Sequence, residues 1–261
     1  MERMPSVAGM FYPGNPEKLR QTLEAFFEGV EVTGNALGIV SPHAGYVYSG
    51  KVATDAFAAL PRNFSGTIII IGPSHAGYST SASSRPWKTP LGTVEVDREL
   101  LEFIDIPVDE LSHRDEHSIE VQLPFVQYHA PEARIVPIMM GNQRWESADL
   151  LAVKIAGAVE RLGHDVRIVA SSDFSHYVPE EEARERDLYA IDALTTLDTA
   201  EFFRRIMERR VSACGYGPIT AMVEACKRLG AERGELLRYT TSAEATGDTS
   251  QVVGYAAIAV I

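Results

Sequence analysis

Residues 67–77, TIIIIGPSHAG, are the stretch that decides the fold class of this chain. Residues 67–71 form an unbroken run dominated by isoleucine, and such a β-branched run predicts a strand whose two faces are both covered. The polar loop that follows has no helical period and carries His75. A buried strand that leads into such a loop is typical of an α/β sheet, in which ligands bind beyond the carboxyl ends of the strands.

Strands and helices alternate on both sides of this stretch. Further strands are predicted over residues 36–40, 134–139, 165–170, 236–241 and 252–260, and helices over 51–60, 118–129, 148–162, 199–208 and 218–229, with one more from about Pro179. This alternation predicts an α/β sandwich with a central, largely parallel or mixed sheet flanked by helices. No internal repeat or linker divides the chain, so we expect residues 1–261 to form a single domain.

The composition limits the classes of function. The 261 residues carry 24 Lys and Arg against 36 Asp and Glu, for a net charge of −12. This acidic balance argues against a nucleic-acid partner, which needs clustered basic residues. No apolar stretch approaches the ~20 residues that span a bilayer, the opening MERMPSVAGMFYPG is no secretory signal, and two cysteines are too few for a disulfide framework. We therefore expect a cytoplasmic protein without a membrane partner, and leave a homo-oligomer open.

Three of the predicted strands end in a short polar motif that carries a histidine. The motifs are SPHAG (41–45), GPSHAG (72–77) and SSDFSH (171–176). A single histidine after a strand is usually an ordinary loop residue, but the repetition predicts that His43, His75, Asp173 and His176 surround one pocket. Because neutral imidazole is a common metal ligand, His43 and His75 are candidate ligands. On the residues alone, a metal site and two loop histidines remain equal alternatives.

Two other segments carry residues that are candidate metal ligands or catalytic groups. If residues 112–125 are helical, either His113 and His117 or His117 and Glu120 share one face, although the same pattern fits an amphipathic helix that packs on the core. Cys214 lies in a glycine-rich turn before a helix, a position that can lower a thiol pKa and make the sulfur a ligand or nucleophile. Tyrosines near these loops favour a small aromatic or phosphorylated ligand; they are Tyr12, Tyr46, Tyr48, Tyr78, Tyr177 and Tyr216.

Seven motifs, in the same order and nearly end to end, resemble the Memo family. This family comprises the mediator of cell motility proteins and their prokaryotic relatives, also called AmmeMemoRadiSam system protein B. The motifs are AGMFYP (8–13), SPHAGYVYSG (41–50), IIIIGPSHAG (68–77), DEHSIEVQLPF (115–125), SSDFSHY (171–177), CGYGP (214–218) and GDTSQVVGY (247–255). The family is similar in fold to the class III extradiol dioxygenases, non-haem iron enzymes that open catechol rings.

The resemblance implies a site. It places His43, His75 and Cys214 around a metal ion, with Asp173 and His176 lining the same pocket. His117 matches a second pocket histidine of the dioxygenases. Those enzymes use two histidines and one carboxylate, whereas Cys214 stands here where the carboxylate is expected. A set of two histidines and a cysteine suits iron or copper, with zinc as an alternative.

Two functions compete on this basis. The first is a metal-dependent oxidoreductase in which His176 is the acid or base, Asp173 orients its imidazole and His117 assists. The second is a non-catalytic binding or signalling module that uses the pocket for a phenolic or phosphorylated ligand, as the association of animal Memo proteins with phosphotyrosine-containing partners suggests. A hydrolase based on Ser74 fits poorly, because GPSHA lacks the last glycine of GxSxG and no helix follows directly.

Overall fold

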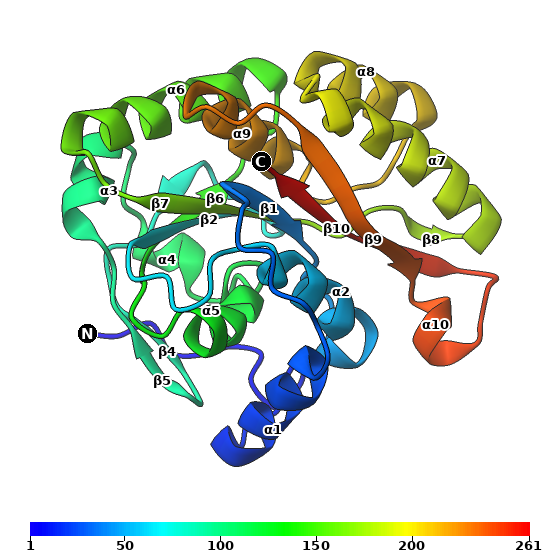
Figure 1. Ribbon diagram of the computed structural model, residues 1–261, viewed down its shortest axis with the longest axis horizontal. Coiled ribbons are helices and arrows are strands. Elements are labelled where there is room, and N and C mark those ends of the chain that lie inside the picture. The colour runs from blue at the N-terminus through cyan, green and yellow to red at the C-terminus, as the bar shows by residue number, and fades with distance from the viewer.

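The computed structural model describes residues 1–261 and is built on an eight-stranded mixed sheet (Figure 1). The strand order is β3-β6-β2-β7-β1-β10-β8, and β9 pairs with β10. The strands are β1 (Gly38–Ser41), β2 (Thr67–Pro73), β3 (Ser81–Ala82), β6 (Arg134–Met140), β7 (Val166–Ser171), β8 (His176–Val178), β9 (Gly234–Thr241) and β10 (Val252–Val260). A separate hairpin joins β4 (Trp87–Thr89) and β5 (Gly92–Val94).

The centre of the sheet is parallel. Strands β6, β2, β7 and β1 pair side by side in one direction, and β10 then pairs antiparallel with β1, β8 and β9. Every residue of β2 is buried, which confirms the strand predicted from its isoleucine run. Because β1, β2 and β7 are parallel, their carboxyl ends meet at one edge of the sheet.

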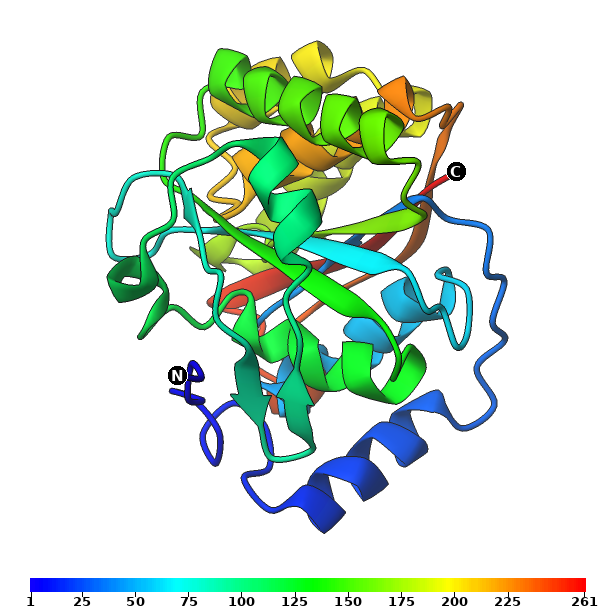
Figure 2. The ribbon, with the colours of Figure 1, turned by 90° about the vertical axis from the view of Figure 1, so that its left-hand side faces the viewer.

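Helices cover both faces of this sheet, as Figures 1 and 2 show. Helices α6 and α9 pack together on one face, where α9 contacts β1, β2 and β7, while α2 and α5 cover the other. The helices are α1 (Pro16–Phe27), α2 (Tyr46–Ala58), α3 (Arg98–Ile104), α4 (Glu110–His113), α5 (Leu123–His129), α6 (Trp145–Leu162), α7 (Glu180–Asp192), α8 (Thr199–Arg209), α9 (Tyr216–Arg228) and α10 (Ala243–Thr246). None of them combines the length and the apolar character needed to cross a membrane.

Close packing against the sheet depends on Gly38 at the start of β1. A Cβ atom at this position would come within 2.5 Å of the Sδ of Met222 and 2.6 Å of the Sγ of Cys226, both on α9. Only a residue without a side chain lets α9 approach this closely. The burial of Cys226 in this contact matches its predicted place in the core.

The α/β class with a mixed central sheet is confirmed, and the errors lie in individual elements. The helix predicted over 51–60 begins already at Tyr46, inside the SPHAGYVYSG motif (41–50). The helix predicted over 118–129 is regular only from Leu123, after a short 3₁₀ turn at Glu120–Gln122. Helix α1 was not predicted, although Asn15 caps its first turn and the following proline is a known start signal.

Candidate metal centre

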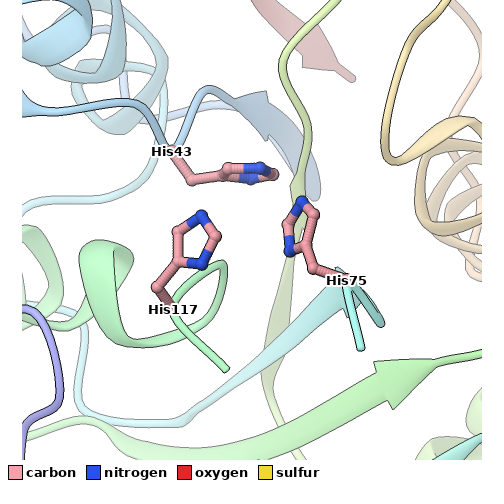
Figure 3. A group of neighbouring side chains, drawn as sticks. All are labelled: His43, His75 and His117. Atoms are coloured by element: carbon pink, nitrogen blue, oxygen red, sulfur yellow. The ribbon is translucent and has the colours of Figure 1, made fainter. Parts of the chain in front are cut away.

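The loops that follow β1 and β2 bring two histidines to the carboxyl edge of the sheet. His43 follows β1 and His75 follows β2, and His117 reaches the same place from the segment before α5 (Figure 3). One ring nitrogen of each histidine lies within 4.8 Å of the others. Three imidazoles at this spacing can hold a metal ion.

Hydrogen bonds fix which nitrogen of His43 carries the proton. The Oγ of Ser171 donates its only hydrogen to the carbonyl of Ser118 at 2.6 Å, so it must accept from Nδ1 of His43 at 2.9 Å. The proton therefore resides on Nδ1, and Nε2 presents a lone pair to the site. Burial, reinforced by the neighbouring His117 and His75, lowers the pKa of His43 well below its usual value and keeps the ring neutral.

His75 is held by a buried carboxylate that the motif analysis did not single out. The Oε1 of Glu116 accepts from Nδ1 of His75 at 2.8 Å, and its Oε2 accepts from the backbone N–H of His75 at 2.9 Å. Burial alone would raise the pKa of Glu116, but these bonds hold it well below the usual range. Burial likewise opposes the charged form of His75, yet its bond to Glu116 raises the pKa of the ring. A carboxylate on Nδ1 directs Nε2 toward a metal ion and increases its basicity.

His117 is packed rather than hydrogen-bonded. Its ring lies against those of His75 and Phe11, with centroids 4.6 Å and 4.9 Å away. Its Nδ1 is 3.7 Å from Oε1 of Glu116, too far for a hydrogen bond. Burial, together with the nearby His75, lowers the pKa of His117 and so favours the neutral ring.

The helical interpretation of the segment around His117 is wrong. Helix α4 ends at His113, whose Nε2 lies in the core 3.2 Å from the carbonyl of Ser81. Glu120 turns away from the site, accepts from Tyr12 at 2.6 Å and forms a buried ion pair with Arg3. The reason is that a buried carboxylate needs charged and hydrogen-bonding partners, and the N-terminal segment supplies them. His117 therefore shares no face with either residue.

Cys214 approaches the histidines from the turn before α9. Its Sγ lies 3.2 Å from Nε2 of His43 and accepts the backbone N–H of Asp173 at 3.3 Å. The expectation of a lowered thiol pKa is wrong for the metal-free protein, because burial and then the nearby charge of Asp173 raise the pKa of Cys214. A metal ion that binds this sulfur must therefore displace its proton.

Asp173 and His176 border the same site but are not paired in the expected way. The Oδ1 of Asp173 accepts the backbone N–H of His43 at 2.8 Å. The Nδ1 of His176 is instead 2.9 Å from the carbonyl of Ser212, to which it must donate. The prediction that Asp173 orients His176 is therefore wrong, since a backbone carbonyl has that role. It leaves Nε2 of His176 as an unprotonated acceptor in the neutral ring.

The donor atoms define the kind of ion that fits. Imidazole nitrogens and one sulfur are the ligands of zinc, copper and iron, whereas Mg²⁺ and Ca²⁺ require several oxygens. The two buried carboxylates beside the histidines are already engaged: Glu116 accepts from the ring of His75, and Asp173 accepts the backbone N–H of His43. The residues therefore fit a transition-metal ion.

Sequence comparisons find relatives that match almost the whole chain. The family model described as Memo-like protein matches residues 3–259. A MEMO1 family protein of Methanosarcina barkeri is 50% identical, with 99% of each chain covered. A second, from Archaeoglobus fulgidus, is 44% identical with 98% of each chain covered. A solved structure of an uncharacterized Escherichia coli K12 protein superposes with a TM-score of 0.49 at 12% identity, covering 85% of this chain and 98% of that one.

A match of this extent, together with relatives at this level of identity, establishes the relationship. The chain belongs to the Memo-like protein family.

Proposed function

We propose that this protein is a metal-dependent oxidoreductase whose iron or copper ion is held by His43, His75 and Cys214. The proposal is supported by the ring nitrogens of His43, His75 and His117, which lie within 4.8 Å of one another, and by the sulfur of Cys214. This sulfur lies 3.2 Å from Nε2 of His43 but is not part of the three-histidine group. Zinc fits the same donors, but it has no redox chemistry and would not support this reaction.

The choice of these three ligands rests on what holds each of them. A metal-bound histidine almost always donates its second ring N–H to a neighbouring group. His43 does so to Ser171 and His75 does so to Glu116, whereas His117 has no such partner. The sulfur of Cys214 is likewise held by the backbone N–H of Asp173. These contacts favour Cys214 over His117 as the third ligand.

The remaining residues of the site are suited to proton transfer. His176 is oriented by Ser212 with Nε2 free, which is the requirement for a general base. His117, with no hydrogen bond of its own, is placed to accept or release a proton next to His75. Asp173 holds the backbone of His43 and adds a negative charge beside the site. A redox metal bound here would supply electron exchange with O₂ or an organic substrate.

Metal quantification after anaerobic purification, combined with O₂ uptake in the presence of catechols, tests the proposal. We expect stoichiometric iron or copper in the wild type and in His164→Ala, a matched histidine substitution outside the site, and none in His75→Ala. Stoichiometric metal with no O₂ uptake on any catechol would contradict the dioxygenase-like reaction. A protein with neither metal nor uptake would overturn the proposal and favour a non-catalytic binding module.

A further inference from the structure

We propose that Gln143, in the loop between β6 and α6, is the residue that positions Cys214 for metal binding. This inference rests on the proposed ligand set and adds a residue that no motif pointed to. Gln143 contacts none of the donor atoms, so it acts only through the turn that carries Cys214.

One amide group bridges the two ends of this turn. The Nε2 of Gln143 donates to the carbonyl of Cys214 at 2.8 Å, and its Oε1 accepts the backbone N–H of Gly217 at 2.9 Å. The orientation of the amide is unambiguous, because a carbonyl can only accept and a backbone N–H can only donate. The side chain thus ties the backbone of Cys214 to the first turn of α9.

The turn is also confined by close contacts on both sides. A Cβ on Gly217 would lie 2.7 Å from the Cβ of Gln143, and a Cβ on Gly215 would lie 2.5 Å from the carbonyl oxygen of Ser171. The two glycines therefore let the turn fit between the β6–α6 loop and the end of β7. With Asp173 bonded to the sulfur itself, Cys214 is held at both its backbone and its side chain.

Gln143 also caps a helix, and an experiment must separate this role from the positioning of Cys214. The N–H of Gly217 belongs to the first turn of α9 and has no partner within the helix, so Oε1 of Gln143 caps the helix. The variant Gln143→Glu separates the two roles. A glutamate retains the acceptor for Gly217, and its charge favours a helix N-terminus, but it has no hydrogen to donate to the carbonyl of Cys214.

The test is titration of the metal-free protein with Co(II), followed through the sulfur-to-cobalt charge-transfer absorption that only a bound thiolate produces. We expect Gln143→Glu to keep the wild-type melting temperature, to lose most of this absorption, and to bind Co(II) roughly 10- to 100-fold more weakly, the usual cost of losing an outer-shell partner. Gln143→Leu removes both bonds and should also lower the melting temperature. Gln127→Leu, which removes an amide bonded to Thr89 in the β4–β5 hairpin, is the control and should leave the absorption unchanged.

The outcomes separate this inference from the proposed function. If the wild type shows no thiolate absorption with Co(II), Cys214 is not a ligand and the ligand set fails. If the wild type shows the absorption and Gln143→Glu has the same intensity and Co(II) affinity, the ligand set stands and the positioning role of Gln143 is overturned.

Discussion

His75 lies in the loop after β2 and His176 begins the short strand β8 that follows β7, and the two histidines differ in what holds Nδ1 of the ring. The Nδ1 of His75 donates to the buried carboxylate of Glu116, whereas the Nδ1 of His176 donates to the neutral carbonyl of Ser212. A carboxylate makes the opposite nitrogen a stronger ligand. A neutral carbonyl fixes the ring without adding charge, which suits a group that gains and loses a proton. This difference is the basis on which we propose metal binding for His75 and proton transfer for His176.

The backbone around His75 also differs from that around His176. His75 follows β2, which is buried along its length. His176 begins the short strand β8 and is followed by Tyr177, which is 73% exposed and has a φ of 57°. A tyrosine in this left-handed region is uncommon, and such strain persists mainly near functional sites. The ring of Tyr177 lies against that of His176 with centroids 5.9 Å apart, so His176 lies beside an exposed side chain.

Substitution of His75 and of His176, one at a time, should give the largest difference between the two residues. We expect the metal affinity of His75→Ala to fall by more than the roughly 10- to 100-fold that follows loss of a group next to a ligand, because the ligand itself is removed. His176→Ala should retain wild-type metal content and lose turnover. The measurements are metal content after dialysis and steady-state rate. Equal loss of metal in the two variants would show that His176 is a ligand and that the comparison is mistaken.

A second prediction concerns Asp187, a buried residue of α7 that holds the loop of His176. Its carboxylate accepts from the Oγ of Ser175 at 2.6 Å and from Tyr239 at 2.7 Å, and burial raises its pKa to about 6. The folded state therefore favours the protonated acid, so its contribution to stability is present below the unfolded pKa and is lost as the pH rises toward 6. The shift from 3.8 to about 6 corresponds to about 3 kcal/mol in total, spread from below pH 3.8 to above pH 6.

Substitution by asparagine removes this titration and keeps a side chain that can accept and donate hydrogen bonds. We expect the unfolding free energy of Asp187→Asn to change less than that of the wild type over the same pH range. Urea denaturation at several pH values measures the difference. Parallel pH profiles for the two proteins would mean that Asp187 is ionised in the folded state throughout, contrary to the raised pKa.

The third prediction concerns Glu116, the carboxylate that accepts the hydrogen bond from Nδ1 of His75. Glu116→Gln keeps the size of the side chain and removes the charge next to Nδ1 of His75, so metal affinity should fall roughly 10- to 100-fold. Competition with a chelator of known affinity measures this change. The conservative Glu116→Asp should recover part of the affinity only if charge, rather than packing, is what matters. Wild-type affinity in Glu116→Gln would remove the basis for treating His75 differently from His176.

The sequence was enough to predict that His43 and His75 lie close together, but not which residues hold them. His43 and His75 could be predicted because both follow strands of a parallel sheet, whose carboxyl ends share an edge. Ser171 and Glu116 could not be assigned their roles, since they lie 128 and 41 positions from the histidines they contact. Contacts at that separation depend on how the loops pack. Glu120 was misplaced because a helical period was assumed across a segment that turns before α5.

X-ray absorption at the metal edge shows whether Cys214 binds the metal together with His43 and His75. In the zinc-loaded protein we predict one sulfur scatterer at about 2.3 Å beside nitrogen scatterers at about 2.0 Å. The sulfur should be absent in Cys214→Ser and unchanged in Cys226→Ser, whose thiol lies in the core between α9 and β1. A shell of nitrogen and oxygen alone in the wild type, identical to that of Cys214→Ser, would contradict the account and leave the three histidines as the ligands.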